Sequence, residues 1–204
     1  MNESCYLCID LKSFYASVEC VERGLDPLKA KLVVADPERG DNTICLAVTP
    51  TLKKMGVKNR CRIFQIPPTI EYIKAVPRMK LYIKYSARIY KIYLKYFSKD
   101  DIHVYSIDEV FIDASRYLGM YGRDAEAMVK AILKDIFEST GITAACGIGT
   151  NLYLAKIALD IEAKKSKDGI AVLNEKTYRE ILWDHKPITD FWRIGRGTAE
   201  RLAK

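Results

Sequence analysis

The stretch CIDLKSFYASVE, residues 8–19, leads from an apolar run through one carboxylate to a pair of aromatic residues. Residues 4–9 are apolar and rich in β-formers, which predicts a buried strand that ends at Asp10. Apolar residues at helical spacing between Ser13 and Gly24 predict a helix directly afterwards. Because burying an unpaired carboxylate is costly, we expect a partner for Asp10 at this strand-to-helix junction.

A second acidic feature lies near the middle of the chain. Residues 103–115, HVYSIDEVFIDAS, alternate polar and apolar side chains on both sides of Asp108 and Glu109. The pattern predicts a tight hairpin with the two acids at its tip. Taken alone, such a pair is most simply explained as an ordinary polar turn.

Outside residues 16–82, the predicted elements follow the order strand, helix, strand, strand, helix, strand. This is the split βαβ pattern of a ferredoxin-like sheet, so the predicted fold class is α+β. The further helices and strands are expected at residues 79–97, 124–139, 142–149, 151 onward and 169–173. The last residues, 175–204, predict a helix, a loop and the start of another helix, so the chain is expected to stop inside a domain.

Residues 16–82 are predicted to form an inserted subdomain of mixed α and β structure. Residues 31–37 and 42–49 predict a pair of strands, and Pro50 opens a short helix. The helix over residues 79–97 alternates tyrosines with lysines and arginines. We expect its tyrosines to face the core and its cations to face solvent, with a base-stacking platform as the alternative.

The composition is that of a globular protein with a buried core: 204 residues, 49% hydrophobic and 29% charged. An excess of 33 basic over 26 acidic side chains gives a formal charge of +7. This charge suits a nucleic-acid partner, although an ordinary basic surface remains the alternative. No apolar stretch is long enough to span a membrane.

Six cysteines are scattered mostly through apolar runs, which predicts reduced, buried thiols in a cytoplasmic protein. The CYLC pair of Cys5 and Cys8 is a weak metal or redox motif, because no second cysteine pair or histidine cluster accompanies it. The KKSK run at residues 164–167 is most simply a solvated loop.

The first strand and the hairpin strands are neighbours in the predicted sheet, so Asp10, Asp108 and Glu109 are expected to meet at one edge. Three close carboxylates raise one another's pKa values, and a divalent cation relieves that conflict. Hard oxygen ligands favour Mg²⁺, and two such ions about 3.5–4 Å apart are suited to phosphoryl displacement.

Three motifs, CIDLKSFYASVE, YSIDEVFID and GIGTNLYLAKIA, together resemble the palm of the Y-family, or translesion, DNA polymerases. The resemblance spans essentially the whole chain and is closest to the branch related to the catalytic subunit of DNA polymerase V. It implies a ferredoxin-like palm with a mixed or antiparallel sheet, an inserted α+β fingers subdomain and a truncated helical thumb. The implied domains are the palm at residues 1–15 and 83–173, the fingers at 16–82 and the start of the thumb at 174–204, without the C-terminal little finger.

The resemblance implies that Asp10, Asp108 and Glu109 are the catalytic residues and bind two Mg²⁺ ions, for which Mn²⁺ could substitute. The carbonyl of Leu11 is implied as a further metal ligand. Many family members carry a second acid or an amide where Lys12 stands here, which alters the charge beside the site.

The nucleotide-binding residues that the resemblance implies are Phe14, Tyr15, Lys53 and Lys156. Tyr15 matches the steric gate that excludes a 2′-hydroxyl, with Phe14 beside it, and Lys156 would contact the incoming triphosphate. Core packing is the alternative for Tyr15, and a helix-surface charge is the alternative for Lys156. Many members place a tyrosine and an arginine where this chain has Pro50 and Lys53, so the fingers here offer the triphosphate a point charge but neither a hydroxyl nor a bidentate guanidinium.

WRIGRGTAERLAK, residues 192–204, resembles the start of a helix-hairpin-helix element that holds DNA phosphates through backbone amides. The implied DNA-binding residues are Gly195, Arg196, Gly197 and Thr198.

We therefore expect an error-prone translesion DNA polymerase that transfers nucleotides from dNTPs to a primer under the direction of a template. A noncatalytic DNA-binding or scaffold protein and a nucleotide cyclase-like enzyme are the alternatives. The implied partners are primer-template DNA and dNTPs, with the sliding clamp and SOS accessory proteins bound through a C-terminal region absent here. The chain alone is expected to be weakly active or inactive, and no membrane partner is expected.

Overall fold

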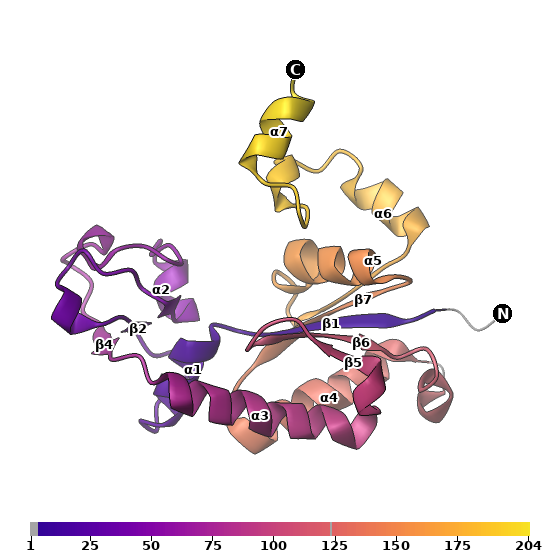
Figure 1. The fold of residues 1–204 in the computed structure, drawn as a ribbon, viewed down its shortest axis with the longest axis horizontal. Helices are drawn as coiled ribbons and strands as arrows, with labels where there is room; N and C mark the ends of the chain where they lie inside the picture. Colours follow the sequence, from indigo (N-terminus) through magenta and orange to yellow (C-terminus); the bar gives the residue numbers. More distant parts are fainter. Residues whose placement is uncertain (1–3, 123) are drawn as a thin grey trace. The chain divides into compact units, whose positions relative to one another are not determined.

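A computed structural model of the chain describes residues 4–122 and 124–204 and divides into two compact units, which are considered separately (Figure 1). Unit 1 contains the N-terminal strand up to Asp10 together with Ile92–Asp135 and Ala144–Lys204. Unit 2 contains Leu11–Lys91 and Ile136–Thr143. Helices α3 (Met79–Tyr96) and α4 (Ala125–Thr140) have residues in both units.

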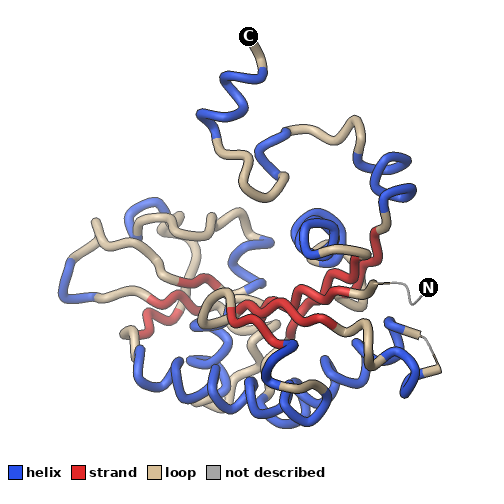
Figure 2. Tube along the Cα trace, turned by 45° about the vertical axis from the view of Figure 1, so that its right-hand side comes forward, coloured by secondary structure: helices blue, strands red, loops and turns tan. Residues whose placement is uncertain are grey.

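Unit 1 is built on a five-stranded sheet in the order β5-β6-β1-β7-β8, drawn in red in Figure 2. Its strands are β1 (Tyr6–Leu11), β5 (Ile102–Val104), β6 (Glu109–Asp113), β7 (Ala144–Gly149) and β8 (Ile170–Leu173). Strand β6 pairs antiparallel with both β1 and β5, whereas β7 and β8 are parallel. Because β6 lies between β1 and β5, the predicted split βαβ arrangement and the α+β class are confirmed, with β8 added at the edge.

Strand β1 is the centre of this sheet. Its residues Leu7, Cys8 and Ile9 are fully buried, which explains why the apolar run shows no polar alternation. The predicted hairpin is also present: Asp108 lies in the turn, and Glu109 is the first residue of β6.

Helix α5 (Leu152–Ile157) begins where Asn151 accepts a hydrogen bond from the backbone N–H of Leu154 at 2.9 Å. A π-helical segment, Ala158–Ala163, continues it without a break. Together they cover one face of the unit 1 sheet (Figures 1 and 2). The close contact depends on Gly147 in β7, where an added Cβ would lie 2.1 Å from the carbonyl oxygen of Ala155.

The C-terminal residues of unit 1 form α6 (Glu175–Leu182) and α7 (Arg196–Leu202). Trp192, between these helices, anchors the segment by packing its ring 5.8 Å from Phe111 and 6.1 Å from Tyr105. The predicted helix, loop and helix beyond Asn174 are therefore present.

Unit 2 contains a smaller sheet in the order β3-β2-β4 and a core of its own. Its elements before α3 are α1 (Phe14–Val21), β2 (Leu32–Val34), β3 (Ala47–Val48), α2 (Pro50–Lys54) and β4 (Ile73–Ala75). The predicted pairing of residues 31–37 with 42–49 is confirmed over a shorter length, with Val33 opposite Val48. The parallel strand β4 was not predicted.

Helix α3 has the predicted division between a core-facing side and a solvent-facing side. Its buried residues include Tyr82, Tyr85, Ile89, Ile92 and Tyr93. Its lysines and arginine are exposed at positions 80, 84, 88, 91 and 95. Packing in the core therefore accounts for the tyrosines that point inward.

All six cysteines are buried free thiols, as the sequence predicts. Across residues 4–122 and 124–204, no helix has the length and hydrophobicity needed to cross a bilayer.

Candidate active site

Two of the predicted catalytic carboxylates face each other across neighbouring strands of unit 1. Asp10, near the end of β1, is directly opposite Glu109, the first residue of β6. Like charges in a cross-strand pair repel, so this arrangement needs positive charge nearby. The sheet register therefore brings together two of the three carboxylates that the sequence predicted to meet.

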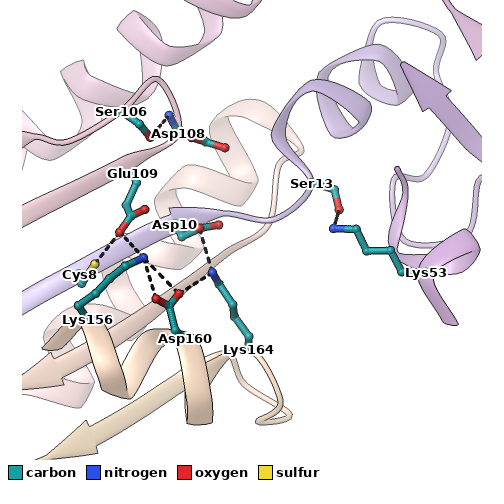
Figure 3. A network of polar contacts seen from close by, with 10 residues as sticks. All are labelled: Cys8, Asp10, Ser13, Lys53, Ser106, Asp108, Glu109, Lys156, Asp160 and Lys164. Carbon is teal, nitrogen blue, oxygen red and sulfur yellow. Dashed lines mark hydrogen bonds and ion pairs between the residues drawn. The ribbon is translucent and has the colours of Figure 1, made fainter. Parts of the chain in front are cut away.

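Two lysines supply that positive charge (Figure 3). Lys156 Nζ lies 2.6 Å from Glu109 Oε1, and Lys164 Nζ lies 3.2 Å from Asp10 Oδ2. Asp160 joins the two lysines at 3.0 Å and 2.9 Å. These five residues form a chain of alternating charge from Asp10 to Glu109, which we call the carboxylate–lysine chain.

Helical spacing explains how one segment contributes three members of the carboxylate–lysine chain. Lys156, Asp160 and Lys164 are four residues apart, so they share one side of α5 and its π-helical continuation. Lys156 is 6% exposed, and Glu109 is 8% exposed. The ion pair between them is therefore largely shielded from water, which strengthens it.

Asp108 and Cys8 complete the surroundings of the two strands. Asp108 lies in the hairpin turn, where its carboxylate accepts a 2.7 Å hydrogen bond from the Ser106 hydroxyl. The Cys8 thiol donates to Glu109 Oε1 at 3.2 Å. Burial and the neighbouring Glu109 charge raise the pKa of Cys8, so it stays a neutral thiol.

The electrostatics of the site reflect burial and neighbouring charges. Burial raises the pKa of Asp10, and Asp108 and Glu109 add to the effect, although Lys164 opposes it. Burial alone would lower the pKa of Lys156, but its hydrogen bond to Glu109 and the charges of Asp160 and Glu109 outweigh burial and raise it. Both lysines are therefore held in the charged form, since the pKa of Lys164 is raised in the same way by Asp10 and Asp160.

The donor set fits a hard divalent cation. Four carboxylates, those of Asp10, Asp108, Glu109 and Asp160, are matched by two lysine ammonium groups, which leaves a formal charge of −2. Oxygen ligands with net negative charge are what Mg²⁺ binds. Within the described part of the chain, no group of three His, Cys, Asp or Glu side chains is arranged to hold a metal ion, and the Glu109 and Asp10 carboxylates pair with lysines.

Comparison with known proteins identifies the family to which this arrangement belongs. Residues 9–160 match the model of the impB/mucB/samB family. The chain belongs to the impB/mucB/samB family. That matched region includes Asp10, the hairpin acids and Lys156, whereas Lys164 lies just beyond it.

Relatives of the impB/mucB/samB protein match it along nearly its whole length. The putative UV-damage repair protein UvrX of Bacillus subtilis is 40% identical over 198 residues, which cover 96% of this chain and 45% of UvrX. DNA polymerase IV 2 of the same organism is 35% identical over 196 residues, which cover 96% of this chain and 46% of the relative. This chain therefore spans about half the length of these curated relatives.

The fold comparison agrees with the family assignment. A solved Y-family DNA polymerase chimera of Dbh and Dpo4 matches with a TM-score of 0.80 at 26% identity, over 98% of this chain and 57% of the chimera. The predicted Y-family fold is confirmed by this match.

The remaining predicted residues of the family site lie mainly in unit 2. Leu11 is the last residue of β1, and Phe14 is buried at the start of α1 while its neighbour Tyr15 is partly exposed. Lys53, on α2, donates a 2.9 Å hydrogen bond to the Ser13 hydroxyl (Figure 3). The role of Leu11 as a metal ligand and the nucleotide-binding roles of the other three residues stay predictions.

The predicted DNA-binding residues surround the start of α7 in unit 1. Gly195 precedes the helix, and its carbonyl accepts a hydrogen bond from the Thr198 N–H at 3.1 Å. Gly195, Arg196 and Gly197 are exposed, and the Arg196 guanidinium pairs with Glu200 at 2.8 Å. Their contact with DNA stays a prediction.

Sequence reasoning did not assign three members of the site: Cys8, Asp160 and Lys164. The KKSK run at residues 164–167 lies in turns and bends with Lys164 exposed, as predicted, but Lys164 also pairs with Asp10, which the sequence did not indicate. Asp160 was not singled out, and Cys8 was considered only as part of the weak CYLC motif. Spacing of four residues from Lys156 was the available signal for Asp160 and Lys164, whereas Cys8 could have been found from its place two residues before Asp10 on the same strand face.

Proposed function

We propose that this chain carries the catalytic centre of a translesion DNA polymerase, with Asp10, Asp108 and Glu109 as its catalytic carboxylates. The observation that carries this proposal is the cross-strand pair of Asp10 and Glu109 next to Asp108, in a chain of the impB/mucB/samB family. The relatives named for UV-damage repair and as DNA polymerase IV support the reaction class.

The three carboxylates, with the carbonyl of Leu11, would hold divalent cations, for which Mg²⁺ is the expected ion and Mn²⁺ a substitute. Bound there, these cations supply charge stabilisation for phosphoryl transfer from a dNTP to the primer 3′-hydroxyl. The sheet fixes the backbone of Asp10 and Glu109 in cross-strand register, so only their side chains need to rearrange to act.

Lysines have the complementary role toward the nucleotide. Lys156 and Lys164 pair with Glu109 and Asp10. We assign both ammonium groups to the phosphate oxygens of the incoming nucleotide, with Lys53 as a third cation. Each lysine would then exchange a carboxylate partner for phosphate oxygens of the nucleotide.

Tyr15, with Phe14 packed beside it, is proposed to exclude ribonucleotides by occupying the space of a 2′-hydroxyl. The Phe14 and Tyr15 ring centroids are 5.7 Å apart. An aromatic ring is a suitable barrier because it is large and has few rotatable bonds.

The domain assignment accompanies this proposal. We assign residues 1–15 and 83–173 to the palm, 16–82 to the fingers and 174–204 to the start of the thumb, with residues 195–198 against DNA phosphates. From the family resemblance we further propose that the sliding clamp and SOS accessory proteins are binding partners and that the protein is cytoplasmic.

The test is primer extension by the complete gene product on an undamaged primed template, with Mg²⁺ and single dNTPs. We expect the nucleotide complementary to the template to be added, and no addition without template or Mg²⁺. Folded protein that binds primed DNA but adds no nucleotide would support the scaffold alternative and contradict the proposal.

The translesion part needs a separate substrate. Templates with an abasic site or a cyclobutane pyrimidine dimer should be copied past the lesion, and undamaged templates should be copied with frequent mispairs. Extension that always stops before the lesion, or that is highly accurate, would leave a polymerase but contradict the translesion assignment.

A further inference from the structure

A second buried polar cluster lies in unit 2, outside the carboxylate–lysine chain. Its centre is Glu19 on α1, whose side chain is fully buried. Glu19 accepts hydrogen bonds from Arg78 Nε at 3.0 Å and Arg78 Nη2 at 2.8 Å, and it also pairs with Arg23. Apolar side chains of similar volume often stabilise a fold as much as a buried ion pair does, so this pair is expected to have a further, positioning role.

The cluster holds Tyr82. The Tyr82 hydroxyl donates a 2.8 Å hydrogen bond to Glu19 Oε1, and the residue is 0% exposed. Its ring stacks on Tyr15, with centroids 4.5 Å apart and planes 16° from parallel. One end of Tyr82 is therefore anchored by a charged hydrogen bond while its face supports the proposed gate.

Helices α1 and α3 bring Tyr15, Glu19, Arg78 and Tyr82 together. Tyr15 and Glu19 are four residues apart on α1, so they lie on the same side of that helix. Arg78 immediately precedes α3, and Tyr82 lies in the first turns of α3. Tyr82 is consequently fixed by Glu19 at its hydroxyl and covered by Tyr15 on its ring.

We propose that Tyr82, anchored by Glu19 and Arg78, is a positioning residue that holds the Tyr15 ring still and thereby sets the discrimination between deoxyribonucleotides and ribonucleotides. This inference rests on the proposed function, in which Tyr15 occupies the space of a 2′-hydroxyl. A 2′-hydroxyl adds one oxygen atom, so a gate ring that moves aside by about 1 Å no longer excludes it. Close packing against a fixed ring prevents that movement.

The chain offers a matched control. Tyr85, one turn further along α3, is also largely buried, and its hydroxyl donates to Glu22 Oε1 at 2.7 Å. Replacing Tyr85 therefore removes a tyrosine ring and a tyrosine–glutamate hydrogen bond between the same two helices. Any general loosening of α1 against α3 will show in both variants.

The experiment measures kcat/KM for a dNTP and for the matching rNTP in single-nucleotide addition by the complete gene product. Tyr82→Leu is expected to lower the dNTP-to-rNTP selectivity about tenfold, equivalent to about 1.4 kcal/mol, through a lower KM for the rNTP. Tyr82→Phe keeps the stacked ring but loses the hydrogen bond to Glu19, so it should lower the selectivity less than Tyr82→Leu does, whereas Tyr85→Leu should leave it unchanged. Glu19→Gln should fall between Tyr82→Leu and wild type.

Tyr15→Ala tests the gate role of Tyr15 separately from the positioning role of Tyr82. If Tyr15→Ala lowers selectivity but Tyr82→Leu does not, or if Tyr85→Leu lowers it equally, the positioning inference is wrong and the proposed function stands. If Tyr15→Ala leaves selectivity unchanged, the gate itself is wrong. A wild-type protein that adds no nucleotide overturns the proposed function and this inference together.

Folding is checked in parallel. Should Tyr82→Leu fail to fold, Tyr82→Phe and Glu19→Gln carry the test, because both keep a side chain of nearly the original shape. Carbon-13 spectra of labelled tyrosines give a readout independent of activity. The Tyr15 ring signal should shift and broaden in Glu19→Gln but stay unchanged in Tyr85→Phe, and an unmoved Tyr15 signal in Glu19→Gln contradicts the inference.

Discussion

At the scale of single residues, Asp108 and Glu109 are neighbours in sequence with different surroundings. Asp108 is partly exposed and bonded to Ser106, whereas Glu109 is buried against Lys156 and Cys8. Asp108→Asn should therefore abolish nucleotide addition and leave the thermal unfolding temperature within a degree or two of wild type. Nucleotide addition and unfolding are measured on the same preparation.

Glu109→Gln should lose activity and stability together. Removing the Glu109 charge leaves the buried Lys156 with Asp160 alone, at a cost of about 1–3 kcal/mol in the free energy of unfolding. Denaturant titration checks this value against Asp108→Asn as the control. Equal stability of the two variants would show that the Glu109–Lys156 pair contributes nothing to folding.

Glu19 predicts a specific pH dependence of stability. Burial raises its pKa, but hydrogen bonds from Arg78, Arg23 and Tyr82 outweigh burial and lower the pKa below the ordinary 4.5. The interactions of the ionised Glu19 with these three partners therefore stabilise the fold above pH 4.5. This contribution is lost as the pH falls through the lowered folded-state pKa of Glu19. Wild type should exceed Glu19→Gln by about 2 kcal/mol at pH 7, and the difference should shrink below pH 4.5.

The measurement is the free energy of unfolding by denaturant from pH 7 to pH 3, with Glu22→Gln as the control. Protonated glutamate and glutamine are nearly isosteric, so the two curves should approach each other in acid. A difference between wild type and Glu19→Gln that does not change with pH would mean that the Glu19 charge is not what stabilises the cluster.

The sequence predicted a site residue correctly where a charged side chain stood at the end of an apolar strand. Asp10 was conspicuous because a buried strand led to a single acid, and its pairing with Glu109 followed from strand order. The pairing of Lys164 was not found because a lysine in a lysine-rich run carries no sign of a partner on a distant strand. Ion pairs between distant elements depend on packing, which periodicity does not encode.

At the scale of elements, the contact between β7 and α5 sets the position of Lys156. An added Cβ at Gly149 would lie 2.3 Å from the backbone nitrogen of Ala155, and one at Gly147 would meet the backbone even more closely. Gly147→Ala and Gly149→Ala should each lower the free energy of unfolding by at least about 2 kcal/mol, because backbone must move. Activity should fall as α5 shifts.

The control is Gly119→Ala, where an added Cβ meets nothing within 4 Å and the backbone is unstrained. Its stability should stay within about 0.5 kcal/mol of wild type in the same denaturant titration. Wild-type stability and activity in Gly147→Ala would contradict the close packing described here.

Element prediction was best for long or strongly patterned segments. Helix α4 and the β5–β6 hairpin were predicted because their apolar periodicities are clear. Strand β4 was missed because it has three residues, and two of them are exposed, so no apolar run marks it. The π-helical segment Ala158–Ala163 was missed because its sequence differs little from that of an ordinary helix.

At the scale of the whole molecule, the net charge of +7 predicts salt-dependent binding to primed DNA. Counterion release should lower the affinity at least about tenfold between roughly 50 and 200 mM salt. Fluorescence anisotropy with a labelled primer-template measures it, and Asp108→Asn should bind at least as tightly as wild type. Affinity independent of salt would contradict a phosphate-based interface.

The central claim is that Asp10, Asp108 and Glu109 together perform template-directed nucleotide transfer. The most direct test is the rate of single-dNTP addition by the complete gene product for wild type, Asp10→Asn, Asp108→Asn and Asp113→Asn. Asp113 lies at the opposite end of β6, opposite Tyr6, and so serves as a matched carboxylate outside the site. The account predicts template- and Mg²⁺-dependent addition by wild type and Asp113→Asn, and a loss of at least about a thousandfold in the other two variants. Near-wild-type rates in folded Asp10→Asn or Asp108→Asn would contradict it.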